Sequence, residues 1–218
     1  MAKHNAFKKR LGWIELITGP MFAGKTADLI RRISRLDYAD VKYAIFKPKL
    51  DTRQKQMISS RNGLELPSIE ITKPEEILDY LMRDEVRAQD IKVIGIDEAQ
   101  FFDNTLVEVC NILAENKYVV IVSGLDKDFR GETFGCMNDL LIAADYVTKL
   151  TAVCHNCGSE AAYSLRIVDD KPARYDESLI LIGCKESYMA VCRHHHRVPG
   201  RPYRSELSKK FIEFARSK

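Results

Sequence analysis

The segment Gly19-Pro20-Met21-Phe22-Ala23-Gly24-Lys25-Thr26 constrains the fold of this 218-residue chain more than any other. It has the G-x-x-x-x-G-K-T pattern of a phosphate-binding loop, in which backbone N–H groups at a helix N-terminus surround a phosphate chain. An apolar run at 13–17 precedes it and predicts a strand, and residues 27–33 predict a helix. Because strand, loop and helix occur in the required order, a glycine-rich turn with an incidental lysine is a poor explanation. The segment predicts a nucleoside-triphosphate site.

Two side chains of this loop have distinct expected roles. Lys25 can reach the β- and γ-phosphates of a nucleotide, whereas the hydroxyl of Thr26 can bind Mg²⁺. A second apolar run, 91–96, ends in Asp97 and Glu98. Because ligands of open α/β sheets bind beyond the carboxyl ends of the strands, we expect both acids beside the loop. Asp97 would then hold Mg²⁺, and Glu98 would perform proton chemistry or orient a water. The alternative is a polar strand end with two solvated acids.

A weaker signal follows the second predicted strand. Asp51, Thr52 and Arg53 come after it, and we expect them at the nucleotide site. Arg53 could neutralise phosphate charge in the transition state, although a surface arginine in a turn explains the pattern nearly as well.

Apolar strand patterns alternate with helical patterns through the first two-thirds of the chain. Strands are predicted at 13–18, 41–47, 91–96 and 117–123, and helices at 25–37, 74–88, 104–116 and 136–144. This alternation predicts an α/β fold with a parallel sheet covered by helices. The dipeptide Asn62-Gly63 predicts a hairpin turn.

After about residue 150 the helical pattern gives way to cysteine, histidine, glycine and proline. We therefore expect a nucleotide-binding α/β domain over 1–150, a small metal-binding domain over 151–200, and a basic, flexible tail over 201–218. The net charge of +3 gives little reason to expect nucleic acid as a partner. With no apolar run near the ~18–20 residues of a membrane span and no signal-peptide core, we expect a cytoplasmic protein.

Two short cysteine motifs in the second domain predict a zinc site. Cys154 and Cys157 form a C-x-x-C pair, and Cys192 and His195 form a C-x-x-H pair. Two such knuckles together supply the four ligands of a tetrahedral zinc site, which leaves no open position and is therefore structural. Spacing alone separates His195 poorly from the neighbouring histidines at 194 and 196.

The remaining cysteines and the segment between the knuckles carry less information. Cys110 and Cys136 lie in helical patterns and are expected to be small buried hydrophobes, whereas Cys184 has no assigned role. Residues 166–185 are expected to form a long loop with few internal contacts, as lids and disordered segments do.

Four motifs in order resemble those of type II thymidine kinases. They are the loop at 19–26, the D-E-A-Q-F segment at 97–101, the S-G-L-D-x-D-F-x-G segment at 123–131, and the paired knuckles at 154–195. The resemblance spans 12–203 and implies a RecA-like domain with a zinc-bearing lasso over a nucleoside. The fourth zinc ligand in many members is cysteine, whereas this chain has histidines there, and zinc accepts both.

The resemblance also implies roles for individual residues. Glu98 would accept the proton of the nucleoside 5′-hydroxyl, and Gln100 would belong to the nucleotide site. The thymine pocket would be formed by Met21, Phe101, Leu125, Phe129, Phe134 and Tyr188. The backbone of Leu179, Ile180, Leu181, Ile182 and Gly183 would bind the base edge. For a single aromatic residue other than Tyr188, core packing is the simpler explanation.

Further implications concern ligands and assembly. The family resemblance implies ATP with Mg²⁺ as phosphoryl donor, thymidine or deoxyuridine as acceptor, feedback inhibition by dTTP, and a homotetramer acting in nucleoside salvage. The strongest alternative is a nucleic-acid-dependent ATPase with a zinc ribbon, because D-E-A-Q occurs in some helicases. Such motors generally need two motor domains, and this chain is too short for them. A non-catalytic zinc-ribbon module would leave the phosphate loop and Glu98 unexplained.

Overall fold

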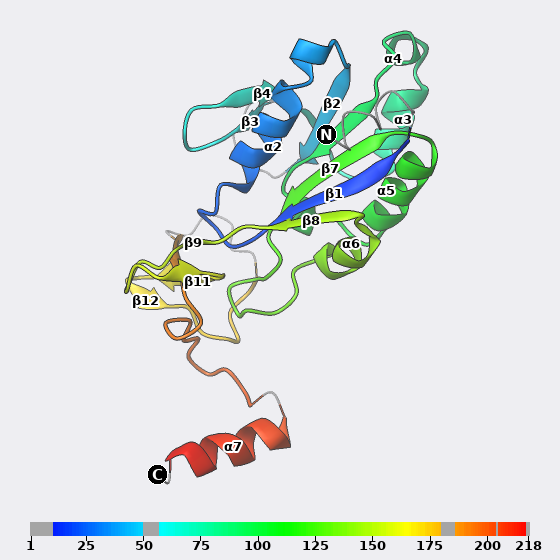
Figure 1. Ribbon diagram of the computed structural model, residues 1–218. Coiled ribbons are helices and arrows are strands. Elements are labelled where there is room, and N and C mark those ends of the chain that lie inside the picture. The colour runs from blue at the N-terminus through cyan, green and yellow to red at the C-terminus, as the bar shows by residue number, and fades with distance from the viewer. Residues whose placement is uncertain (1–10, 50–56, 180–185, 204, 217–218) are drawn as a thin grey trace.

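The described part of the chain is residues 11–49, 57–179, 186–203 and 205–216 of a computed structural model, and it contains a six-stranded parallel sheet with helices on both faces (Figure 1). The strand order is β5-β2-β6-β7-β1-β8, and every neighbouring pair is parallel. These strands are β1 (Trp13–Thr18), β2 (Tyr43–Pro48), β5 (Ile69–Ile71), β6 (Val93–Ile96), β7 (Val119–Gly124) and β8 (Tyr146–Lys149). The predicted α/β fold with a parallel sheet is confirmed.

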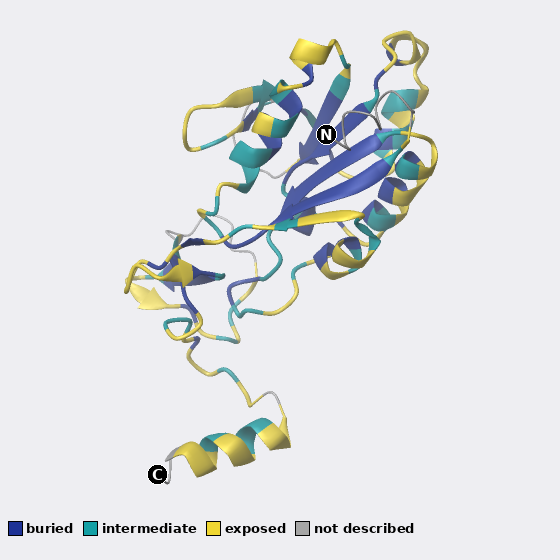
Figure 2. Cartoon of the chain, viewed as in Figure 1, coloured by how far each residue is buried: buried dark blue, intermediate teal, exposed yellow. Residues whose placement is uncertain are grey.

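Two hydrophobic cores lie on opposite faces of this sheet, because successive side chains of a strand point to opposite sides. The helices are α2 (Lys25–Ser34), α3 (Glu76–Met82), α4 (Asp84–Arg87), α5 (Thr105–Glu115) and α6 (Met137–Ala143), with short 3-10 turns η1 (Asp37–Ala39) and η2 (Ala99–Phe101). On one face, Ile14 and Leu16 of β1 pack with side chains of α3, α4, α5 and α6. On the other face, Trp13 and Ile17 pack with α2. The central strands β1, β6 and β7 are therefore buried between helices, whereas the edge strand β8 is largely exposed (Figure 2).

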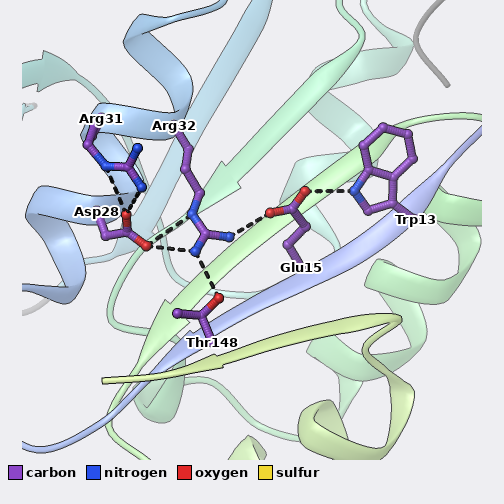
Figure 3. A network of polar contacts seen from close by, with 6 residues as sticks. All are labelled: Trp13, Glu15, Asp28, Arg31, Arg32 and Thr148. Atoms are coloured by element: carbon purple, nitrogen blue, oxygen red, sulfur yellow. Dashed lines mark hydrogen bonds and ion pairs between the residues drawn. The ribbon is translucent and has the colours of Figure 1, made fainter. Parts of the chain in front are cut away.

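A buried polar network fixes α2 against the sheet (Figure 3). Glu15 of β1 is 5% exposed and accepts hydrogen bonds from Trp13 Nε1 at 2.9 Å and from Arg32 Nη1 at 2.6 Å. Arg32 also donates to Asp28 at 2.7 Å and to the Thr148 hydroxyl at 2.9 Å. Because these partners belong to β1, α2 and β8, the network holds the helix that follows the phosphate-binding loop in one place on the sheet.

A hairpin lies beside α2. Its strands β3 (Met57–Ser59) and β4 (Glu65–Pro67) are antiparallel, with Ser59 opposite Glu65. The connecting turn contains Gly63 with a φ of 78°. The hairpin predicted from Asn62-Gly63 is therefore confirmed, and Ile58 of β3 joins the core under α2.

Residues 151–200, the expected second domain, contain short antiparallel strands. They are β9 (Ala152–Val153), β10 (Glu160–Ala161), β11 (Tyr163–Val168), β12 (Lys171–Pro172) and β13 (Glu186–Val191). β9 pairs with β10, and β11 lies between β12 and β13. The expected loop with few contacts over 166–185 is wrong for its first part, because β11 continues to Val168 and Arg166 is fully buried. Both polar residues of β11, Ser164 and Arg166, are buried, and the sequence pattern does not indicate this.

The tail contains a helix, α7 (Glu206–Arg216), that the sequence pattern did not predict. In Figure 1 it lies apart from both domains. Its apolar side chains Leu207, Phe211 and Phe214 are exposed. Among the described residues, no helix is both long and apolar enough to cross a membrane.

Candidate functional site

The phosphate-binding loop lies between the end of β1 and the start of α2, as its pattern predicts. Gly24 caps the helix in the left-handed region, with φ of 81° and ψ of 23°, which a residue with a Cβ adopts only with strain. A Cβ on Gly19 would lie 2.3 Å from the carbonyl oxygen of Leu150, so only glycine fits there. The first N–H groups of α2 at this end form an anion-binding site.

Lys25 lies over the loop. Its Nζ donates to the carbonyl oxygen of Pro20 at 2.9 Å. Burial lowers the pKa of Lys25, and the nearby carboxylates of Glu98 and Asp97 oppose that shift. The ammonium group is therefore between the loop and the acidic end of β6, where it can meet a phosphate chain.

Asp97 links the loop to the two central strands. Its Oδ2 accepts a hydrogen bond from the Thr26 hydroxyl at 3.0 Å, and its Oδ1 accepts one from the Ser123 hydroxyl. Hydroxyl and carboxylate oxygens are ligands that Mg²⁺ prefers, so Thr26 and Asp97 form a suitable pair for that ion. The predicted neighbourhood of the loop and the acidic strand end is thus present.

Glu98 has a special backbone conformation and a fixed side chain. Its φ of 53° and ψ of 39° are left-handed, which is uncommon for a residue other than glycine. Its Oε2 accepts a hydrogen bond from Gln100 Nε2, and Gln100 Oε1 in turn accepts from the backbone N–H of Leu125 at 2.9 Å. Burial and then the charge of Asp97 raise the pKa of Glu98, whereas Gln100 and Lys25 oppose the shift. The buried amide of Gln100 therefore orients Glu98.

A single cleft of about 770 Å³ contains the loop, Glu98 and most of the expected pocket residues. The predicted residues that line it are Met21, Phe22, Ala23, Gly24, Lys25, Thr26, Glu98, Gln100, Phe101, Leu125, Phe129, Phe134, Leu179 and Tyr188. Asp51, Thr52 and Arg53, and Ile180, Leu181, Ile182 and Gly183, lie outside the described residues. The cleft is therefore polar and cationic at the loop and apolar at the aromatic residues.

The aromatic part of the cleft joins the two domains. Phe101 and Phe134 meet edge to face, with ring centroids 5.6 Å apart. Phe129 comes from the segment after β7 and packs with the core of the second domain. Across the cleft, the Ser164 hydroxyl of β11 accepts a hydrogen bond from the backbone N–H of Met21 at 2.9 Å. A direct hydrogen bond therefore joins the phosphate-binding loop to the second domain.

Sequence reasoning missed several residues of the cleft. They are Lys47, Ser59, Ser60, Arg61, Asn62, Glu70, Lys127, Asp128 and Ser164. Lys47 is the next-to-last residue of β2, so the rule that pointed to Asp97 could have found it. Arg61 follows β3, and its guanidinium carbon lies 3.9 Å from the ring centroid of Phe22. No pattern in the sequence indicated that this hairpin reaches the loop.

The two knuckles converge in the second domain. One ligand atom from each of Cys154, Cys157, Cys192 and His195 lies within 4.8 Å of the others. His195 Nδ1 is 3.6 Å from Cys154 Sγ and 3.2 Å from Cys192 Sγ, and the sulfurs of Cys157 and Cys192 are 3.9 Å apart. Tetrahedral zinc with these ligands would separate them by about 3.5–3.8 Å. The cluster can hold a metal ion and fits zinc.

The neighbouring histidines have other surroundings. His196 Nε2 lies 2.8 Å from the carbonyl oxygen of Phe129, and its ring stacks on Tyr163 with centroids 4.6 Å apart. His194 is exposed. Of the three candidate histidines, His195 is therefore the one that lies in the cysteine cluster. Cys110 and Cys136 are buried as expected.

Comparison with known proteins gives a consistent result. The sequence model of the thymidine kinase family matches residues 12–196. A thymidine kinase of Ureaplasma urealyticum serovar 10 is 61% identical over 218 residues, which is 100% of this chain and 97% of that relative. One from Ureaplasma parvum serovar 3 is 59% identical over 218 residues, which is again 100% of this chain and 97% of that relative. One from Mycoplasmoides gallisepticum is 52% identical over 203 residues, 93% of this chain and 88% of that relative.

Proposed function

The chain belongs to the thymidine kinase family, and on this premise we propose that it transfers the γ-phosphoryl group of ATP to the 5′-hydroxyl of thymidine or deoxyuridine. The observation that carries the proposal is the shared cleft. Lys25 and Thr26 line one part of it, and Phe101 and Phe129 line another. Glu98 lines the same cleft, so one cavity has room for a donor, an acceptor and a base.

In the proposed reaction, Glu98 accepts the proton of the 5′-hydroxyl as that oxygen attacks the γ-phosphorus. Its raised pKa, caused first by burial and then by the charge of Asp97, makes it a stronger base than an exposed glutamate. The hydrogen bond from Gln100 keeps its carboxylate in one orientation. Phosphoryl transfer depends chiefly on such positioning and on charge neutralisation. We also propose that Gln100 contacts the nucleotide directly.

Groups of the phosphate-binding loop would neutralise the negative charge of the phosphates. The ammonium of Lys25 and the N–H groups of residues 19–26 would bind the phosphate chain. Thr26 and Asp97 are the residues that would hold Mg²⁺. When bound with ATP, that ion neutralises charge on the β- and γ-phosphates. Asp51, Thr52 and Arg53 are proposed to complete the phosphate site.

The aromatic part of the cleft would receive the base. Thymine is flat and largely apolar, so it suits rings such as Phe101, Phe134 and Tyr188, together with Met21 and Leu125. The backbone of 179–183 would supply hydrogen bonds to the base edge. The metal cluster would fix the second domain, and its four protein ligands fit a structural zinc rather than a catalytic one.

Regulation, assembly and setting are proposed from the family resemblance alone. They comprise inhibition by dTTP, a homotetramer and action in nucleoside salvage. A cytoplasmic location stays an expectation from the sequence itself. The division into domains at 150 and 200 is likewise proposed. Its support is that β9 pairs with β10 and β11 pairs with β12 and β13, whereas β8 pairs with β1 of the parallel sheet.

The deciding experiment measures transfer of labelled phosphate from ATP to each of the four deoxynucleosides and to deoxyuridine. We expect product with thymidine and deoxyuridine only. Transfer to purine deoxynucleosides at a similar rate, or ATP turnover stimulated by single-stranded DNA alone, would refute the proposal. Glu98→Gln, whose turnover should be strongly lowered, is assayed in parallel to detect contaminating kinases.

A further inference from the structure

Arg166 is a fully buried charged residue that lies behind the nucleoside side of the cleft. It belongs to β11, where its partner in register on β13 is Tyr188, and its exposed fraction is 0%. A buried guanidinium is costly unless its charge and its donors are compensated. It does not line the cleft, but Tyr188, Phe129 and Leu179 all do.

The guanidinium joins two walls of the cleft that are far apart in sequence. Its Nη1 donates to the carbonyl oxygens of Ser178 at 2.6 Å and Leu179 at 3.3 Å. Its Nη2 pairs with Glu177 Oε2 at 3.2 Å. On its other side, its Cζ lies 3.9 Å from the ring centroid of Phe129. One planar group therefore contacts both the Phe129 ring and the backbone that leads to Leu179.

A second arginine reinforces the same connection. Arg130 Nη2 donates to the carbonyl oxygen of Glu177 at 2.6 Å, and its Cζ lies 5.3 Å from the Phe129 ring centroid. Arg130 therefore also joins the segment after β7 to the segment before Leu179. Unlike Arg166, it is partly exposed.

We propose that Arg166 is a positioning residue that sets the separation of Phe129 and Leu179, and thereby the fit of the cleft to the nucleoside. This inference rests on the proposed function, because it assumes that a nucleoside base lies between these walls. The guanidinium is suited to this task because its donors form a rigid planar fork and its face stacks on an aromatic ring. Lysine would keep the charge but lose the stacking and the fixed pair of hydrogen bonds.

The test compares Arg166→Met, Arg166→Lys and the control Arg174→Met in the full-length zinc-loaded protein. Arg174 is in the same domain, and its side chain is exposed and pairs with Asp176. Steady-state kinetics give KM for thymidine and for ATP separately, and each variant is checked for zinc content and melting temperature. We expect KM for thymidine to rise roughly tenfold or more in Arg166→Met, since small misplacements of binding groups have large effects. KM for ATP should stay within about twofold, and Arg166→Lys should recover only part of the loss.

A double-variant comparison separates positioning from a general structural role. If Arg166 acts through the Phe129 ring, Arg166→Met should raise KM for thymidine less in a Phe129→Leu background than in the unmodified protein. Equal changes in both KM values, or a full effect in the Phe129→Leu background, would overturn the inference. An unchanged KM for thymidine in a folded, zinc-containing Arg166→Met protein would do so too.

A milder variant covers the case in which Arg166→Met loses zinc or fails to fold. Glu177→Gln removes the charge partner and leaves the guanidinium in place. It should raise KM for thymidine by a smaller factor, with KM for ATP unchanged, and no change in either value would overturn the inference. Failure of the unmodified protein to phosphorylate thymidine would instead refute the proposed function, and this inference with it.

Discussion

The hydroxyl of Thr26 donates to Oδ2 of Asp97 at 3.0 Å, although the two residues are 71 positions apart. Thr26 is in the first turn of α2, which follows β1, and Asp97 follows β6, which is not a neighbour of β1 in the sheet. β7 lies between β1 and β6, and its Ser123 donates to the other oxygen of Asp97. The carboxylate is therefore fixed by the first turn of α2 and by the end of the intervening strand. A metal ion bound here would meet a pair of oxygen atoms already in place.

This pairing predicts a change in magnesium dependence. Asp97→Asn should raise the Mg²⁺ concentration needed for half-maximal phosphate transfer by about 10–100-fold, the usual range for altered metal surroundings. Thr26→Ser keeps the hydroxyl and is the matched control, so it should stay near the unmodified value. A Mg²⁺ titration of activity measures both. An unaltered Mg²⁺ requirement in Asp97→Asn would remove Asp97 from the metal site.

The position of Glu98 predicts a selective loss of turnover. Glu98→Gln should lower kcat by about 10²–10⁴-fold, which is the contribution of a positioned base, while ATP affinity is maintained. Glu115→Gln changes an exposed carboxylate at the end of α5 and should have no effect. Kinetics with thymidine and binding of a fluorescent ATP analogue give the two quantities. Near-normal turnover in a folded Glu98→Gln protein would end the assignment of Glu98 as the base.

The cluster of knuckles predicts one zinc ion per chain with His195 as a ligand. His195→Ala should lose zinc and destabilise the second domain, because structural zinc contributes directly to folding. His194→Ala is the matched control and should keep a full equivalent. Elemental analysis of protein purified without chelator provides the measurement. Zinc retained in His195→Ala but lost in His194→Ala would reverse the assignment.

The phosphate-binding loop and the ends of the central strands could be predicted from sequence because their signals are local. Glycine spacing specified the turn before α2, and the apolar run before Asp97 specified a buried strand. Ligands of open α/β sheets bind beyond the carboxyl ends of the strands, and this rule predicts that Asp97 lies near Thr26 even when the strand order is unknown. The cysteine spacing identified the metal cluster for the same reason.

The rest depends on long-range contacts that leave little trace in the sequence. β5 and β8 pair at the sheet edges, but each has only three or four residues and no clear period. Arg166 looks like a polar loop residue, and its burial depends on Glu177 and Phe129, which lie outside its own strand. The choice between His195 and His196 as the metal ligand likewise depends on a distant residue, because Nε2 of His196 contacts the carbonyl oxygen of Phe129. Spacing along the chain does not encode such partners.

The polar network under α2 predicts an acid-sensitive contribution to stability. Burial alone would raise the pKa of Asp28, but hydrogen bonds and charges from Arg31 and Arg32 outweigh it and hold the pKa below its usual range. The ionised form is therefore stabilising above the unfolded pKa of about 3.9, and this stabilisation is lost as the pH falls through the lower folded value.

Asp28→Asn should accordingly lower the free energy of unfolding by roughly 1–3 kcal/mol at pH 7, which is typical of a charge-assisted hydrogen bond. The difference between the two proteins should shrink as the pH falls below about 4. Asp40→Asn, which disrupts an exposed pair with Lys42, is the control and should change little. Urea unfolding across this pH range measures the difference. A difference that stays constant with pH would contradict the assigned role of Asp28.

The shared cleft also predicts how an end product would inhibit the enzyme. The loop residue Lys25 and the aromatic residues Phe129 and Tyr188 line the same cavity of about 770 Å³. In dTTP the base could occupy the aromatic part while the triphosphate extends toward the loop. One molecule would then exclude both substrates, and no separate regulatory site would be required. Inhibition should therefore weaken when either ATP or thymidine is raised.

The experiment measures initial rates over a grid of ATP, thymidine and dTTP concentrations, together with hydrogen exchange. Binding of dTTP should slow hydrogen exchange of the amides in 171–179, because contacts with the base would order that segment. Ordering the segment costs conformational entropy, which those contacts must offset. Lys25→Met should weaken the binding of dTTP, because the variant lacks the ammonium group that would contact the phosphates. Thymidine should still bind, because it carries no phosphate. Inhibition that neither substrate relieves, together with unchanged exchange, would require a second site for dTTP.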